Sequence, residues 1–230
     1  MKAIKICFFV LLLLTAYADT ECGKENESCS ILFIGSSYFD FFDVPYIVKS
    51  LAEKGGKQVE VDESIRNGLY LADHAQMTET EAMINLKDWD YVVLQGVGTL
   101  MAYPDIYTHH PVYPAIQTLM RKIHDNCAAT KVVFCLPWAY EDGMTWLQGW
   151  TDTYNDMQDK IYENTLKYAG ELGLIIAPVG SAWKRVLNEK QFPLHYLHLS
   201  DWNHASLKGS YLMSCVIYST LFCESCVKKS

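Results

Sequence analysis

Short apolar runs alternate with longer amphipathic segments along most of the chain. Runs of this length between turn residues are typical of buried parallel strands. They predict five strands, at residues 31–34, 58–62, 90–95, 131–136 and 174–177. Helical spacing of apolar residues between and after them predicts helices at 44–54, 70–86, 111–124, 151–172 and 206–222.

This alternation of strands and helices predicts the fold class. Strands that are separated by helices form a parallel sheet with right-handed crossovers and helices on both faces. We therefore expect an α/β protein, a three-layer α/β/α sandwich with about five parallel strands, in a single domain over residues 19–230. The active site of such a sheet lies beyond the carboxyl ends of its strands, so the loops after residues 34, 62, 94 and 136 are the places to search.

The N-terminus has the pattern of a targeting segment. Lys2 and Lys5 precede an apolar run at residues 6–14, and Ala16-Tyr17-Ala18 follows as a small-residue cleavage site. We expect a signal peptide at residues 1–18 and a secreted or periplasmic product. The apolar run is well short of the roughly 20 residues that cross a bilayer, so no membrane span is expected after cleavage.

Composition and charge exclude some classes of binding partner. Half of the 230 residues are hydrophobic and 20% are charged, which is enough apolar material for an enzyme-sized core. The net charge of -8 and the lack of a Lys/Arg cluster argue against a nucleic-acid partner, because phosphate neutralisation needs a basic face. A small-molecule or carbohydrate substrate is expected instead.

The cysteines leave the disulfide pattern open. Seven remain after signal cleavage, and an odd number leaves at least one unpaired within a monomer. An oxidising compartment makes some pairing plausible. Cys223 and Cys226 lack the context of a redox or zinc motif, which favours buried thiols or a local disulfide. The seven cysteines are Cys22, Cys29, Cys127, Cys135, Cys215, Cys223 and Cys226.

A candidate nucleophile follows the first strand. Residues 31–34 lead into Gly35-Ser36-Ser37. A hydroxyl at a strand-to-helix turn is exposed and rigidly held, and its own N–H can face a developing oxyanion. The alternative is that the serines only form the turn and cap the next helix. A flavodoxin-like phosphate loop would need a longer run of glycine and hydroxyl residues.

A candidate acid and base lie just before the last helix. A serine nucleophile needs an imidazole to take its proton and a carboxylate to orient that imidazole. Asp201 stands three residues before His204, so one loop can carry both groups. Taken singly, Asp201 could be a capping residue and His204 a surface histidine.

Together these two segments resemble the SGNH, or GDSL-like, hydrolase family. Its first block has the nucleophilic serine after a hydrophobic strand, and its last block is Asp-x-x-His before the C-terminal helix. Residues 31–39 and 201–204 match these blocks, and alignment on the glycine makes Ser37 the nucleophile. The resemblance implies a flavodoxin-like sandwich that hydrolyses esters through an acyl-enzyme, with Ser37, Asp201 and His204 as the triad and no metal or organic cofactor.

The middle blocks of the family suggest the oxyanion hole. The second block supplies a glycine N–H, which Gly68 matches here, although Gly68 could also be a turn glycine. The third block usually supplies an asparagine, and this chain has none at that place. Gln95 offers the same amide donor on a longer arm, so Ser37, Gly68 and Gln95 are the expected oxyanion donors.

Other histidines compete for these roles. His195 and His198 lie close to His204 but lack an acid at the Asp-x-x-His spacing. The His109-His110 pair raises the question of a metal, but adjacent histidines rarely ligate one ion, and no third ligand stands at a convincing spacing. No metal is therefore expected.

Aromatic residues gather in the expected catalytic loops. Flat rings at this edge suit stacking on sugar faces, and the resemblance includes exported enzymes that deacetylate polysaccharides. The alternative is that the rings only pack the loops. We expect an esterase for small acyl groups, acetyl above all, on a carbohydrate; an acyltransferase and a non-catalytic carbohydrate-binding protein are the alternatives. The aromatic residues are Trp138, Tyr140, Trp146, Trp150 and Trp202.

Overall fold

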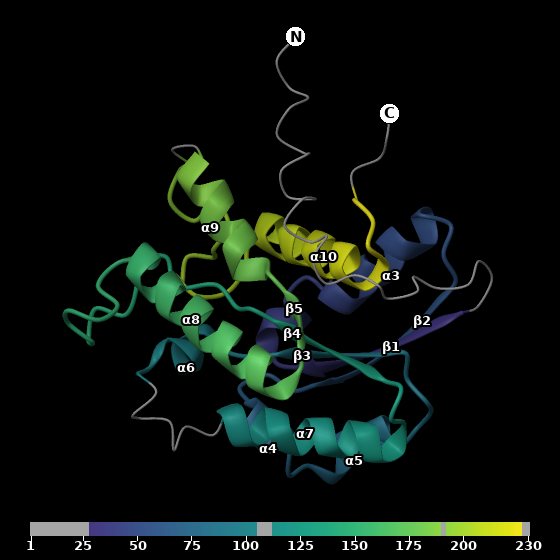
Figure 1. Cartoon of the computed structure of the whole chain (residues 1–230). Coiled ribbons are helices and arrows are strands. Elements are labelled where there is room, and N and C mark those ends of the chain that lie inside the picture. Colours follow the sequence, from purple (N-terminus) through teal and green to yellow (C-terminus); the bar gives the residue numbers. More distant parts are fainter. Residues whose placement is uncertain (1–27, 105–111, 190–191, 227–230) are drawn as a thin grey trace.

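A five-stranded parallel sheet forms the centre of the computed structural model, which describes residues 28–104, 112–189 and 192–226 (Figure 1). The strand order is β2-β1-β3-β4-β5. This confirms the predicted sheet. The strands are β1 (Cys29–Gly35), β2 (Val59–Ile65), β3 (Tyr91–Gln95), β4 (Lys131–Cys135) and β5 (Ile175–Ala177).

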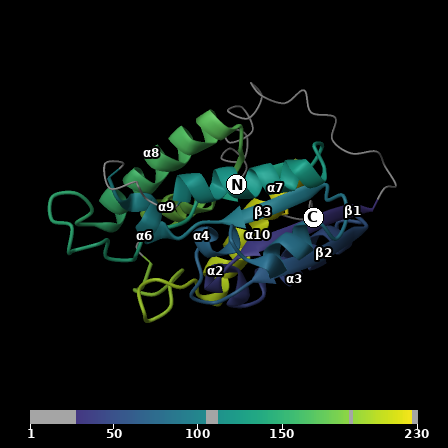
Figure 2. The same ribbon diagram turned by 90° about the horizontal axis from the view of Figure 1, so that it is seen from below.

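Helices cover both faces of this sheet, as predicted. One apolar core lies between the sheet and α3, α9 and α10, and a second lies between the sheet and α4, α5, α7 and α8 (Figure 1; Figure 2 gives the view from below). The helices are α2 (Ser37–Asp40), α3 (Val44–Lys54), α4 (Leu71–His74), α5 (Thr78–Ile84), α6 (Gly98–Ala102), α7 (Val112–Asn126), α8 (Tyr154–Leu172), α9 (Val179–Glu189) and α10 (Leu207–Phe222).

The first strand contributes to both cores. Ile31 and Phe33 point to the core under α3 and α10, whereas Leu32 and Ile34 point to the other. All four side chains are fully buried. Successive residues of a strand face opposite sides, so a strand with helices on both sides has a continuous apolar run.

The register brings the carboxyl ends of the strands to one edge. Gly35 pairs with Ile65, and Gln95 pairs with Cys135. The chain moves from β1 outward to β2 and then returns to β3 on the other side of β1. The loops after β1 and β3 therefore leave the sheet at the point where the strand order reverses, which is where open α/β sheets bind ligands.

Four helical segments differ from the prediction. The expected helix at 70–86 is two short helices, because Gln76 and Met77 donate to carbonyls three residues back, and this tighter turn ends α4. The helices α2, α6 and α9 were not predicted. The helices α2 and α6 have four and five residues, which is too short for a helical period to show in the sequence. The helix α9 begins two residues after the end of β5.

Several predictions lie outside the described residues. These are the signal peptide at 1–18, Cys22 and the His109-His110 pair, which stay predictions. Within the described ranges, no disulfide joins two cysteines. None of the helices there has both the length and the apolar character to cross a membrane.

Candidate active site

The loop after β1 holds the candidate nucleophile at the first position of α2. The carbonyl of Ser36 accepts hydrogen bonds from the N–H groups of Phe39 and Asp40, which closes the turn. The imidazole of His74 donates from Nε2 to the carbonyl of Gly35 over 2.9 Å. Ser37 is thus fixed from both sides of a strand-to-helix turn.

Ser37, His204 and Asp201 form a continuous relay. Ser37 Oγ lies 2.9 Å from His204 Nε2. His204 Nδ1 lies 2.6 Å from Asp201 Oδ2. The geometry fits an imidazole that takes the serine proton at Nε2 while its Nδ1–H donates to the carboxylate. The three side chains chosen from the sequence therefore meet in space.

The carboxylate of Asp201 is held by its own loop. Its Oδ1 accepts the backbone N–H groups of Asn203, over 3.0 Å, and His204, over 2.9 Å. Partial burial raises the pKa of Asp201, but the hydrogen bonds from His204 and Asn203 outweigh it and hold the pKa below its ordinary value. The group is ionised at neutral pH, as an orienting acid requires.

The backbone on either side of His204 is fixed as well. Ala205 forms an antiparallel bridge with His198. The carbonyl of His204 accepts the N–H of Leu199 over 2.7 Å. Ser206 then caps α10 by accepting the N–H of Gly209. The base therefore stands on a short hairpin that runs directly into a long helix.

The competing histidines have other partners. His195 binds Glu141 with its Nδ1, at 2.6 Å, and with its backbone N–H. His198 is fully buried and donates from Nε2 to the carbonyl of Ala139. Burial lowers the pKa of His198, although Glu141 opposes this. Among the residues that the structure describes, His204 is the histidine that contacts Ser37.

Two backbone donors, one on Ser37 itself and one in the loop after β2, have no acceptor among the described residues. Within the described ranges, neither the N–H of Ser37 nor that of Gly68 donates a hydrogen bond. The first N–H groups of a helix have no partner inside it, which explains the free donor of Ser37. Gly68 has a φ of +80°, a conformation that suits glycine. The hydrogen bond from Arg66 N–H to the carbonyl of Gly35 brings its loop to the nucleophile.

The amide of Gln95 contacts the backbone of Ser36 and Gly96, whereas the sequence suggested that it would face the oxyanion. Its Oε1 accepts the backbone N–H of Ser36 at 2.9 Å, and its Nε2 donates to the carbonyl of Gly96 at 2.6 Å. The side chain is 3% exposed. This arrangement braces the nucleophile loop through the oxygen of the amide, and the oxyanion-donor role of Gln95 stays a prediction.

Trp138 requires a correction. Its side chain is 1% exposed and stacks on Tyr38 at 4.4 Å and on Trp183 at 4.3 Å. Its indole N–H donates to the carbonyl of Asn203 over 2.8 Å. Trp138 therefore belongs to the core beneath the triad loop and presents no face to a sugar.

The other aromatic residues are divided between packing and solvent. Trp146 is 58% exposed and contacts the half-buried Tyr140 edge to face. Trp202, between the acid and the base, is 38% exposed. The indole N–H of Trp150 donates to the carbonyl of Ala102, which fixes this side chain against the end of α6. Trp146, Tyr140 and Trp202 thus remain candidates for binding a substrate.

Trp202 has an unusual backbone that neighbouring groups support. Its φ is +67°, which bulky residues rarely adopt. Its carbonyl accepts the N–H of Glu141 over 2.9 Å, and the ring of His195 meets its indole at 85° with centroids 5.0 Å apart. Strained residues of this kind concentrate at functional sites.

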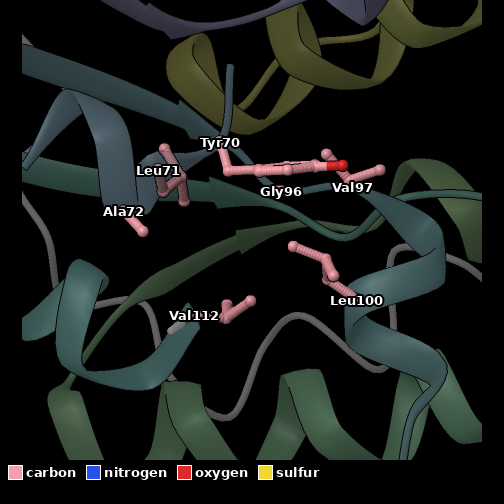
Figure 3. Close-up of a pocket in the computed structure, with 7 residues that line it drawn as sticks. All are labelled: Tyr70, Leu71, Ala72, Gly96, Val97, Leu100 and Val112. Carbon is pink, nitrogen blue, oxygen red and sulfur yellow. The ribbon is translucent and has the colours of Figure 1, made fainter. Parts of the chain in front are cut away.

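A small apolar cavity opens beside the loops after β2 and β3 (Figure 3). It measures about 240 Å³ when the solvent-filled space at its open mouth is counted, and the space between its walls is much smaller. The figure shows the ring of Tyr70 beside Gly96 and Val97, with Leu100 and Val112 on the opposite side. Tyr70 comes two residues after Gly68 in the chain, so the cavity lies along the same loop as one oxyanion donor.

Sequence reasoning missed the side chains that support the triad. Tyr38 bonds Asn203, Phe41 stacks on His204, and His74 holds Gly35. Tyr38 and Phe41 lie in the first matched block or beside it, but an apolar ring there is equally expected in the core. The contact of His74 joins distant segments, and no local pattern marks it.

The described residues contain no group of three or more histidine, cysteine, aspartate or glutamate side chains that could hold a metal ion. The expectation that the reaction needs no cofactor stays a prediction, and the His109-His110 pair lies beyond what this finding covers.

Comparisons with known proteins identify the fold. A candidate SGNH hydrolase from Slackia heliotrinireducens superposes with a TM-score of 0.66 at 23% identity, over 85% of this chain and 100% of the other. A DUF4886 family protein from Bacteroides uniformis gives 0.68 at 18% identity, over 86% and 84%. A variant of an acetyl xylan esterase from Geobacillus stearothermophilus gives 0.61 at 18%, over 87% and 97%.

These similarities define the class of structure. The chain has the three-layer fold of SGNH hydrolases, in agreement with the resemblance seen in its sequence. No protein-family model matches the chain, and no curated protein matches it in sequence.

Proposed function

We propose that the protein is a secreted or periplasmic serine esterase that removes small acyl groups, acetyl above all, from a carbohydrate. The observation that carries the proposal is the relay from Asp201 through His204 to Ser37, with contacts of 2.6 and 2.9 Å. Similarity to acetyl xylan esterases supports an ester substrate. The predicted signal peptide supports export.

The mechanism follows from the relay. His204 takes the proton of Ser37 at Nε2 as Ser37 Oγ attacks the ester carbonyl, and it then protonates the departing alcohol. Water, activated by the same nitrogen, attacks the acyl-enzyme and releases the acid. Asp201 keeps Nδ1 protonated and stabilises the imidazolium in both steps.

Backbone donors stabilise the tetrahedral intermediate in this proposal. The N–H groups of Ser37 and Gly68 are free to bind the oxyanion. Donors that are fixed before the reaction act without reorganising, and the loss of one typically costs about 10²–10³ in rate. Gln95 accepts the N–H of Ser36 and so braces the residue directly before Ser37.

The two sides of the site suit different parts of the substrate. We place the acyl group in the apolar cavity beside Gly96 and Leu100, which is small enough to favour short chains. We place the sugar against the exposed indoles of Trp202 and Trp146. Aromatic rings that are exposed on one side offer an apolar surface for the flat face of a sugar.

The test compares wild-type protein with Ser37→Ala and the matched control Ser36→Ala. Substrates are p-nitrophenyl acetate and acetylated xylo-oligosaccharides, and a fluorophosphonate probe reports the nucleophile. Wild type and Ser36→Ala should hydrolyse both substrates and label with the probe, whereas Ser37→Ala should do neither. Hydrolysis by Ser37→Ala at the wild-type rate contradicts the proposal.

A further inference from the structure

The hydroxyl of Tyr38 is a buried polar group between two loops of the site. Tyr38 follows Ser37 directly, and its O–H donates to Asn203 Oδ1 in the loop that carries the acid and the base. This hydroxyl therefore connects the loop after β1 to residues 201–204.

Asn203 is held a second time, through its main chain. Its carbonyl accepts the indole N–H of Trp138 over 2.8 Å, and Trp138 itself stacks on Tyr38. Its N–H donates to Asp201 Oδ1 over 3.0 Å. Asn203 thus lies between two buried rings on one side and the carboxylate of the triad on the other.

Solvent access does not weaken this arrangement. Tyr38 is 2% exposed, so water does not compete for its hydroxyl. Burial raises the pKa of Tyr38 well above its ordinary value, and the hydroxyl stays protonated. It is therefore a permanent donor to Asn203. A hydrogen bond in such a low-dielectric place is stronger than one in water.

We infer that Tyr38 is a positioning residue of the triad, whose bond to Asn203 sets the distance between Ser37 Oγ and His204 Nε2. A single peptide link joins Tyr38 to the nucleophile, and a single one joins Asn203 to the base. The bond closes a short ring between the two loops, beside the contact of Ser37 with His204 and the stacking of Phe41 on His204. The inference rests on the proposed role of Ser37 as nucleophile.

The first experiment compares Tyr38→Phe with Tyr218→Phe. Both variants keep the ring and lose a hydroxyl that bonds a side chain, but Tyr218 bonds Glu224 at the end of α10, away from the triad. Tyr38→Phe should lower kcat for p-nitrophenyl acetate by about 10- to 100-fold with KM within about twofold, since a misplacement on the order of 1 Å costs about 10² in rate. Tyr218→Phe should leave kcat within about twofold.

A double-mutant cycle isolates the bond itself. If Tyr38 acts through Asn203, then Asn203→Ala lowers kcat similarly, and the double variant is no slower than the slower single variant. Rate losses that multiply in the double variant overturn the inference. So does a Tyr38→Phe enzyme with the kcat of the wild type.

A measurement without substrate separates this inference from the proposed function. The Nδ1 proton of His204, bonded to Asp201, gives a low-field NMR resonance that is sharp while the loop is fixed. Tyr38→Phe should broaden or remove this resonance through faster exchange with water, and Tyr218→Phe should not. If wild type hydrolyses no ester, the esterase proposal fails, while the resonance still decides whether Tyr38 positions the base. An unchanged resonance in Tyr38→Phe counts against the inference.

Discussion

The ring of Phe41 lies stacked on the imidazole of His204, with centroids 4.4 Å apart and planes 25° apart. The backbone of Phe41 is anchored to the last helix, because its carbonyl accepts the hydroxyl of Ser210 over 3.3 Å. The base is therefore held by a face contact as well as by its two hydrogen bonds. Rotation of the imidazole away from Ser37 would have to break this stack.

Removing this ring should slow the reaction moderately. Aromatic pairs contribute about 0.5–1.5 kcal/mol, so Phe41→Ala should lower kcat for p-nitrophenyl acetate by roughly 2- to 10-fold, as His204 gains other orientations. Phe42→Ala is the control, since Phe42 is exposed and makes no ring contact with His204 in the described structure. Equal kcat values for the two variants would show that the stack has no role.

Gln95→Ala distinguishes bracing from oxyanion binding. Loss of the amide leaves the buried N–H of Ser36 without its acceptor, which should lower the free energy of unfolding by about 1–3 kcal/mol. We expect this loss together with a lower kcat. The measurements are urea unfolding and steady-state kinetics. A fall of about 10²–10³ in kcat at unchanged stability would instead support the donor role that the family resemblance suggested.

The sequence predicted the sheet and the relay because both leave local patterns. The apolar run of β1 requires burial on both faces, and the spacing of Asp201 and His204 fits a single loop. No local sequence pattern predicts whether an aromatic ring is buried or exposed. Trp138 and Trp202 were indistinguishable in the sequence, yet Trp138 is enclosed between Tyr38 and Trp183, while Trp202 reaches solvent.

The sequence also could not predict the direction in which a side chain points. The position of Gln95 at the end of β3 was predicted, but its amide could turn toward the substrate or toward Ser36. The outcome depends on which buried backbone groups need a partner, and this is known only once β1 and β3 lie side by side. The contact from His74 to Gly35 likewise depends on the packing of distant segments.

Leu100→Ala should change the preferred acyl length. Leu100 lines the small cavity, so its truncation makes room for longer chains (Figure 3). A methylene in an apolar pocket changes discrimination by about 1–3 kcal/mol. The ratio of kcat/KM for p-nitrophenyl butyrate to that for the acetate should therefore rise by roughly 10-fold. Leu86→Ala is the control, because Leu86 is exposed and lies outside the cavity. If both variants give the same ratio of kcat/KM values, the cavity does not bind the acyl group.

Trp202→Ala should separate sugar binding from chemistry. Loss of the indole should raise KM for acetylated xylo-oligosaccharides severalfold and leave their kcat nearly unchanged, because a ring that contacts only the sugar acts equally on ground and transition states. KM for p-nitrophenyl acetate, which has no sugar, should stay the same. If KM rises equally for both substrates, the effect comes from a disturbed triad loop.

The free energy of unfolding should decrease at low pH because histidine side chains are buried in the folded protein. Burial lowers the pKa of His74, although its bond to Gly35 and the charge of Asp73 oppose this, and Arg66 adds to it. Above the ordinary pKa of about 6.5 neither state binds the proton, and below it the unfolded chain binds the proton more readily. The free energy of unfolding should therefore decrease as the pH falls below about 6.5, by up to about 1.4 kcal/mol per pH unit from this residue.

The test of this pH dependence is urea unfolding of the wild type and His74→Gln between pH 8 and pH 5. His198 contributes in the same direction, since burial lowers its pKa too, so the slope in His74→Gln should become shallower without vanishing. His124→Gln, at an exposed site of α7, should keep the wild-type slope. If the free energy of unfolding depends on pH equally in His74→Gln and the wild type, then His74 has the same pKa in the folded and unfolded states. That result would contradict the lowered pKa of the buried imidazole.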